Sequence, residues 1–173
     1  MNEGRPAMPQ WRPMTAADLA GAYDLSTRSH PDFPERRDVL FEKFRLFPRG
    51  CFVLDGPGTE IAGYCFSHPW EIGAPPALDT MLQVLPLQPA AYFIHDVTVD
   101  SSLRRMNLAS SLVPRLVEIA RSIPVGHMTL VAVSGSEPFW ARSGFRRTAD
   151  EGLQDAARRK YGAGAVHMTR DTA

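Results

Sequence analysis

Apolar positions near the start of the chain recur with the period of a helix. Thr15 opens the run Thr-Ala-Ala-Asp, in which a hydroxyl and a carboxylate three residues later form a capping box. The apolar positions that follow have helical spacing: Leu19, Ala22, Tyr23 and Leu25. Residues 29–34 contain prolines and end this helix. A second helix is predicted at about 35–47.

Short apolar runs predict the strands. The runs 51–54 and 61–66 flank the turn Asp55-Gly-Pro-Gly58 and indicate a hairpin. Longer runs at 92–99 and 127–133 have the composition of buried strands. Weaker strands are predicted at about 11–14 and 164–169.

The segments between these strands complete the predicted fold. Helices are expected at 105–122 and 136–144, and the proline-containing stretch 68–91 is expected to be a long lid or binding loop. This order predicts an α/β protein of the α+β type, with a mixed, mostly antiparallel sheet and helices on both faces. We expect a single domain over 11–173, preceded by a flexible tail at 1–10.

Composition excludes several classes of protein. The 173 residues carry no formal net charge, which argues against a nucleic-acid or membrane partner. No apolar run is long enough to span a bilayer, and the two cysteines form no CxxC pair, so a cytoplasmic location is expected. The five histidines are scattered, and no metal site is predicted.

The run from Tyr92 to Val113 carries the chemistry. It predicts a buried strand, a basic turn and the start of an amphipathic helix. A helix N-terminus has free N–H groups and a positive dipole end, and Arg104 and Arg105 stand beside it. The sequence therefore predicts an anion-binding site.

Two motifs extend this prediction. The basic turn reads Arg104-Arg-Met-Asn107-Leu-Ala109, and a later short helix reads Phe139-Trp-Ala-Arg-Ser-Gly-Phe145. In this order, after two buried strands, they resemble the coenzyme loop and the Phe-Tyr-x-x-x-Gly-Phe helix of the GNAT superfamily of acetyl-CoA-dependent N-acyltransferases. The resemblance covers about 11–170, and it implies a GNAT-like domain that uses acetyl-CoA as cosubstrate.

The resemblance implies which residues hold the coenzyme. Backbone amides of the turn would cradle the pyrophosphate, and the strand before it would bind the pantetheine arm. The implied coenzyme residues are Val97, Val99, Arg104, Arg105, Asn107, Ala109, Ser110, Ser134 and Trp140.

Three residues depart from expectation. Asn107 replaces the first loop glycine, and asparagine tolerates positive φ best among other residues. Trp140 replaces a tyrosine that the resemblance would make the acid for the departing thiolate, and an indole has no useful acidity. Pro114 interrupts the predicted helix, which predicts either a bend near Ser110 or a later helix start.

The catalytic candidates are His95 and Asp96. An amine must lose a proton before it attacks a thioester, and either side chain could accept it, directly or through water. Strand alternation places the two on opposite faces, with His95 on the face of Val97 and Val99. A structural strand histidine and a buried ion pair at Asp96 are the alternatives. Because neither cysteine lies in a motif with a base, no covalent intermediate is expected.

The acceptor side is expected to be apolar and aromatic. Its predicted lining is Tyr23, His30, Phe33, His68, Trp70 and Tyr92, which favours a small apolar or aromatic amine as acceptor. Alternatives are an acyl-CoA-binding module without efficient turnover, and an enzyme that acetylates a protein N-terminus or lysine. A homodimer is left open.

Overall fold

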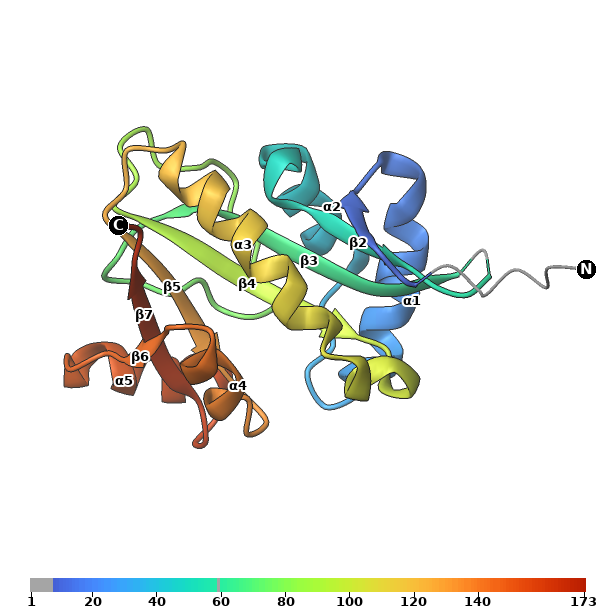
Figure 1. Cartoon of the computed structure of the whole chain (residues 1–173). Coiled ribbons are helices and arrows are strands. Elements are labelled where there is room, and N and C mark those ends of the chain that lie inside the picture. Colours follow the sequence, from blue (N-terminus) through green and yellow to red (C-terminus); the bar gives the residue numbers. More distant parts are fainter. Residues whose placement is uncertain (1–7, 59) are drawn as a thin grey trace, which may run out of the picture.

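A computed structural model describes residues 8–58 and 60–173. Its framework is a seven-stranded sheet of order β1-β2-β3-β4-β5-β7-β6, with helices on both faces (Figure 1). All neighbouring strands are antiparallel except β4 and β5, so the predicted mixed, mostly antiparallel sheet is confirmed. The strands are β1 (Trp11–Pro13), β2 (Phe52–Asp55), β3 (Ile61–Trp70), β4 (Ala91–Val99), β5 (His127–Ala132), β6 (Arg146–Arg147) and β7 (Val166–Asp171).

Five α-helices accompany the sheet in the described part of the chain. They are α1 (Leu19–Ser29), α2 (Arg37–Leu46), α3 (Leu108–Arg121), α4 (Glu137–Arg142) and α5 (Glu151–Tyr161). Short 3₁₀ turns occur at Ala16–Asp18, Pro48–Gly50 and Ser101–Met106. The sequence analysis did not predict α5, which is rich in charged residues and buries only Gln154, Ala157 and Tyr161.

Two hydrophobic cores lie on opposite faces of the sheet. On one face, α3 packs Leu112 and Leu116 against β4 and β5. On the other, α1 and α2 pack Leu25 and Leu40 against β2 and β3. Figure 1 shows α3 crossing one face, with α1 and α2 on the other. The sheet is therefore the middle of three layers, as helices on both faces require.

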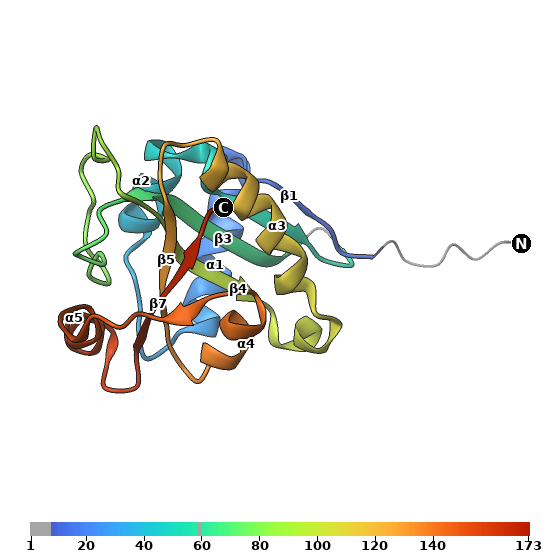
Figure 2. The same ribbon diagram turned by 60° about the vertical axis from the view of Figure 1, so that its left-hand side comes forward.

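The long connection after β3 is irregular, but hydrogen bonds hold it against α2 and α5. Glu42 on α2 accepts hydrogen bonds from the backbone N–H groups of Leu82 and Gln83. On α5, Lys160 and Tyr161 donate to the carbonyls of Pro75 and Pro76. Figure 2 shows this segment between α2 and α5. These contacts hold the loop along the edge of the site.

Strands β4 and β5 pair only at their beginnings. Their parallel register runs from Ala91 opposite His127 to Ile94 opposite Leu130. Beyond these residues β4 continues to Val99 paired with β3 alone, and β5 continues to Ala132 paired with β7 alone. The two strands therefore splay, and the edge of β4 beyond Ile94 faces a gap.

A β-bulge in β4 changes the faces of its side chains. Ile94 pairs with Ser67 and Asp96 pairs with Phe66, which leaves His95 without a partner in β3. An extra residue in one strand resets the alternation of side chains. The prediction that His95 and Asp96 point to opposite faces is therefore wrong. Both face the side of α1, whereas Val97 and Val99 pack in the α3 core.

Helix α3 begins later than predicted. A 3₁₀ turn occupies Ser101–Met106, and the helix starts at Leu108 after Asn107. Pro114 lies inside the helix and is exposed. Of the two alternatives for Pro114, the later start is confirmed, and it places the helix N-terminus at the end of the basic turn.

Candidate functional site

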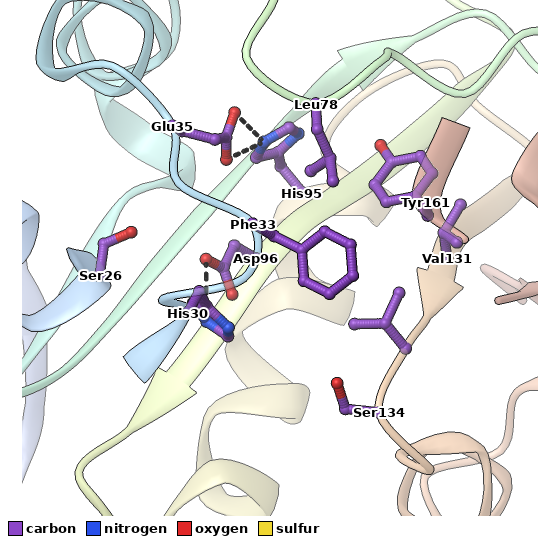
Figure 3. A pocket seen from close by; sticks show the side chains of 11 residues that line it. Ser26, His30, Phe33, Glu35, Leu78, His95, Asp96, Val131, Ser134 and Tyr161 are labelled. Atoms are coloured by element: carbon purple, nitrogen blue, oxygen red, sulfur yellow. Dashed lines mark hydrogen bonds and ion pairs between the residues drawn. The ribbon is translucent and has the colours of Figure 1, made fainter. Parts of the chain in front are cut away.

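Three adjoining hollows lie where β4 and β5 splay. We call them the inner cavity, the central cleft and the outer groove, with volumes of about 60, 290 and 320 Å³. The inner cavity is bounded by the α1–α2 connection, β4, β5 and α5 (Figure 3). The central cleft lies in the gap between β4 and β5, and the outer groove follows the basic turn toward α4.

His95 is held by Glu35 in the wall of the inner cavity. Its Nε2 lies 3.2 Å from Oε1 and 3.4 Å from Oε2 of Glu35, and its side chain is fully buried (Figure 3). A carboxylate accepts only, so Nε2 carries the proton and Nδ1 is the lone-pair nitrogen. Among the described residues, Nδ1 has no hydrogen-bond partner. His95 therefore has the tautomer of a general base.

Glu35 is ionised despite its burial. Burial by itself would raise the pKa of this carboxyl, but the charge of the His95 ring when it is protonated, its hydrogen bond and the charge of Lys43 hold the pKa at about 2. Lys43 Nζ lies 3.6 Å from Oε2 and is buried as well, and burial lowers the pKa of that amine. The backbone N–H of Asp79 donates to the same oxygen of Glu35. These contacts fix the carboxylate that orients His95.

Asp96 is the centre of a second network. Tyr64 donates its hydroxyl hydrogen bond to Oδ2 at 2.6 Å, and Thr98 donates to Oδ1 at 3.0 Å. His30 Nε2 lies 2.9 Å from the Thr98 hydroxyl and 3.7 Å from Oδ2 of Asp96. Both carboxylate oxygens are thus already engaged, which suits an anchoring role better than that of a free base.

The tautomer of His30 follows from this network. The single hydroxyl proton of Thr98 is donated to Asp96, so Thr98 can only accept from His30. His30 therefore carries a proton on Nε2, and its Nδ1 takes no part in this network. Two imidazoles with Nε2 turned toward carboxylates thus line one cavity.

The basic turn has the backbone geometry of an anion cradle. Asn107 adopts left-handed dihedrals, φ 55° and ψ 27°, immediately before the first residue of α3. The turn therefore reverses into the helix N-terminus without a glycine, as predicted. Most residues expected to hold the coenzyme line the outer groove or the central cleft: Val97, Val99, Arg104, Asn107, Ala109, Ser134 and Trp140.

The free edge of β4 suits an extended ligand. Beyond Ile94 its backbone N–H and C=O groups on the β5 side have no strand partner in the described residues. Unpaired strand edges bind extended chains by main-chain hydrogen bonds. The edge leads from the anion cradle to His95 and Asp96, so an anion with an extended arm fits this path.

Comparison with known families decides the classification. The profile described as Acetyltransferase (GNAT) family matches residues 18–145, which is most of the chain. The chain belongs to the GNAT acetyltransferase family. A comparison with curated proteins found no match.

Solved GNAT structures share the whole fold. The loading GNATL domain of CurA from Lyngbya majuscula matches with a TM-score of 0.78 at 14% identity, over 96% of this chain and 98% of that domain. The GphF GNAT-like decarboxylase in complex with isobutyryl-CoA matches with 0.72 at 17% identity, over 95% and 100%. The ribosomal-protein-S18-alanine N-acetyltransferase from Escherichia coli matches with 0.65 at 18% identity, over 96% and 95%. At these identities the likeness shows the fold alone.

Two of the coenzyme residues expected from the GNAT resemblance lie at the margin. Arg105 is exposed in the basic turn and does not line the groove. Ser110 lies in the first turn of α3, beside a shallow hollow with Arg142 and Arg170. The other expected residues stand along one continuous path. Trp140 forms its wall, with its ring packed on Phe139 and Phe145.

The expected acceptor lining is only partly assembled. His30 and Phe33 line the inner cavity. Tyr92 does not, because it is fully buried on the α3 face with its hydroxyl 2.7 Å from that of Ser67. His68 is also core, with Nδ1 donating to the Pro69 carbonyl.

Tyr23 and Trp70 also lie outside the inner cavity. Tyr23 packs on the core under α1, and Trp70 donates to the Ala74 carbonyl at the end of β3. The structure therefore does not bring these two residues, His68 and Tyr92 to the inner cavity. His68, Trp70 and Tyr92 lie on strands and Tyr23 lies on α1, in positions that residue type alone does not reveal.

Several site residues were not anticipated. Glu35 and Thr98 complete the histidine networks, and Leu78, Val131 and Tyr161 close the inner cavity. The signal for Glu35 was weak, since an acidic residue in a polar connection is ordinary. Thr98 could have been found, because its predicted strand position is two residues from Asp96.

Neither a metal site nor a membrane span is found in the described residues. No group of three or more histidine, cysteine, aspartate or glutamate side chains could hold a metal ion there. Within the same residues, no helix is both long and apolar enough to cross a bilayer. Cys51 and Cys65 are free and buried, and burial raises the pKa of the Cys51 thiol to about 12.

Proposed function

We propose that this GNAT protein transfers the acetyl group of acetyl-CoA to the primary amine of a small, apolar acceptor by direct attack. One observation carries the proposal. His95 presents an unpartnered Nδ1 in the inner cavity, its Nε2 is held by Glu35, and this cavity adjoins the path that suits the coenzyme.

The chain offers a fitting place for each part of acetyl-CoA. The N-terminus of α3, Arg104 and the turn at Asn107 would hold the pyrophosphate. The free edge of β4 at Val97 and Val99 would bind the pantetheine arm, as GNAT family resemblance implies. Trp140 and Ser134 would flank the arm in the central cleft. When bound, the cosubstrate supplies the activated acetyl thioester.

The inner cavity suits an ammonium group on an apolar body. Two of its residues are the carboxylates Glu35 and Asp96, and among the described residues no lysine or arginine lines it. Phe33, Leu78 and Val131 supply apolar walls. Its volume of about 60 Å³ is less than half of the roughly 150 Å³ that holds a benzene ring, so it suits the amine and its first carbons.

The reaction needs one proton acceptor at the amine. The cationic amine first loses a proton to solvent, and the neutral nitrogen attacks the thioester carbonyl. As the C–N bond forms, His95 Nδ1 accepts the second proton that the nitrogen loses, and Glu35 compensates the positive charge of the resulting imidazolium. The C–N bond forms, the C–S bond breaks, and CoA leaves. A buried thiol of raised pKa is a poor nucleophile, which supports direct attack.

A thiol-release assay tests the proposal. Acetyl-CoA is offered with short alkylamines, arylalkylamines, polyamines, amino acids and peptides, and we expect release only with small apolar amines. His95→Gln should lower kcat by about 10²-fold or more without changing the Kd of CoA. The control is His127→Gln, an exposed histidine paired with Asp171.

Other outcomes separate the alternatives. Thermal stabilisation by acetyl-CoA without thiol release for any amine would favour a coenzyme-binding module that does not turn over. Release only with peptides would favour a protein N-terminal or lysine acetyltransferase. Malonyl-CoA offered without an amine is a further control, and we expect no decarboxylation, because the carboxylates of the inner cavity repel a second carboxylate.

A further inference from the structure

His30 lies between the two halves of the site. It is the one described residue that lines the inner cavity, the central cleft and the outer groove together. It ends α1 and enters the site from the side opposite β5 (Figure 3). A group at this junction touches both the space suited to the amine and the path suited to the coenzyme.

The departing thiolate needs a proton that no tyrosine of the site can readily supply. Trp140 has an indole where an acid was expected. The hydroxyl of Tyr64 is engaged by Asp96, and that of Tyr161 by the Pro76 carbonyl. Burial raises the pKa of both phenols, so neither is a ready proton donor.

His30 has the arrangement of a proton donor. Its Nε2–H donates a hydrogen bond to the Thr98 hydroxyl, and Oδ2 of Asp96 lies 3.7 Å from the same nitrogen. The negative charge of Asp96 would stabilise the positive charge of a protonated His30 ring. Its side chain is one-third exposed, so water can return a proton after each turnover. The ionisable residues around it, besides Tyr161, are Glu35, Tyr64, His95, Asp96, Arg104 and Arg142.

We propose that His30 donates a proton from Nδ1 to the sulfur of CoA as the C–S bond breaks, with Thr98 and Asp96 as positioning residues. The inference rests on the proposed acetyl transfer and names the acid that this reaction needs. The amine proton goes to His95, the His30 proton goes to sulfur, and the products are the amide and CoASH. Solvent then takes the proton of His95 and restores that of His30.

The first test needs no acceptor amine. A cationic imidazole beside the sulfur stabilises a thiolate, so the thiol of bound CoA should ionise at lower pH in the wild type than in His30→Gln, by about one pH unit. The ultraviolet absorbance of the thiolate, at saturating CoA, measures this midpoint. His127→Gln is the matched control and should match the wild type.

The second test uses turnover. A base gives the rising limb of the pH dependence of kcat/KM and an acid gives the falling limb. We expect His30→Gln to lose the falling limb and about 10²-fold in kcat, whereas His95→Gln loses the rising limb. Thr98→Val should shift the falling limb of the kcat/KM profile to a different pH, although His30 is still present.

The outcomes distinguish the two proposals. If CoA binds and its thiol ionises at the same pH in the wild type and in His30→Gln, the role of His30 is overturned, and acetyl transfer is still judged by the amine panel. If the midpoint shifts but no amine releases thiol, His30 does face the sulfur and the proposed acetyl transfer fails. If CoA does not bind, both fail.

Discussion

Nε2 of His95 lies 3.2 Å from Oε1 of Glu35, a residue 60 positions earlier in the chain. This contact joins the α1–α2 connection to the bulge in β4 and sets the tautomer of the ring. The same carboxylate lies 3.6 Å from the buried Lys43. Glu35 therefore serves both the proposed chemistry, through His95, and the stability of the fold, through Lys43. Separate measurements can test these two roles.

Replacing Glu35 by Gln should impair the chemistry. The amide carbonyl can still accept from His95, but the negative charge that compensates the imidazolium is lost. We expect kcat to fall about 10-fold, less than the roughly 10²-fold or greater loss from removing a general base. The Kd of CoA should not change. Glu71→Gln, at an exposed loop position, is the control, and equal kcat in both variants would contradict the role of Glu35.

Replacing Glu35 by Ala should destabilise the protein through Lys43. The variant leaves a buried ammonium group without its partner, which typically costs about 3–5 kcal/mol. Adding Lys43→Met removes the unpaired charge, so the double variant should recover much of the loss. Urea unfolding of both single variants and the double variant measures the coupling. Additive effects would show that the pair is not energetically linked.

His68 should make the protein sensitive to mild acid. Burial, with the nearby charge of His95, lowers the pKa of His68 from 6.5 to about 3. Between these values the unfolded chain binds a proton that the folded protein does not, so stability falls as pH falls below 6.5. The loss approaches about 1.4 kcal/mol per pH unit. In His68→Phe this slope should be shallower in urea unfolding across that range, and an unchanged slope would assign the acid sensitivity elsewhere.

Asn107 should be replaceable by Gly but not by a β-branched residue. Asn107 has a φ of 55°, a conformation that glycine adopts with little cost in free energy but that strains valine by about 1–3 kcal/mol. If that strain is relieved by distorting the anion cradle, Asn107→Val should weaken acetyl-CoA binding by about 10-fold, which corresponds to about 1.4 kcal/mol. Asn107→Gly should bind as the wild type does. Calorimetric titration compares the acetyl-CoA affinities of the two variants. Equal affinities would show that the conformation of Asn107 does not determine acetyl-CoA binding.

Pro114 should lower the stability of α3. It has no N–H to donate to the Ser110 carbonyl, and proline in a helix interior costs up to about 3 kcal/mol. Because Pro114 is exposed, Pro114→Ala should raise the free energy of unfolding without disturbing the core. Thermal unfolding measures the gain. A lower Tm of Pro114→Ala would mean that the local backbone accommodates the proline. The proline would then stabilise the protein by restricting the unfolded chain.

The backbone geometry of the basic turn was predictable from sequence because its determinants are local. A strand, a basic turn and a helix N-terminus follow one another in the chain, and Asn107 needed only its own conformational tolerance to positive φ. The order of most strands and helices was predictable for the same reason. Helix α5 was not, because it buries only Gln154, Ala157 and Tyr161 in a sequence rich in charged residues.

The lining of the inner cavity was poorly predicted because its residues come together only in three dimensions. Tyr92 and His68 have the side chains of a binding pocket, but sheet register places them in the core. Glu35 resembles any exposed carboxylate until the α1–α2 connection brings it to His95.

The sequence by itself determined the order of most strands and helices and the basic turn that leads into α3, since both depend on neighbours in the chain. The tertiary structure alone decided the arrangement around the two histidines. The bulge leaves His95 without a partner in β3 and turns it and Asp96 to one face. Long-range packing then supplies Glu35 to one ring and Thr98 to the other. Sheet register and contacts between distant segments depend on the whole fold, and no local pattern encodes them.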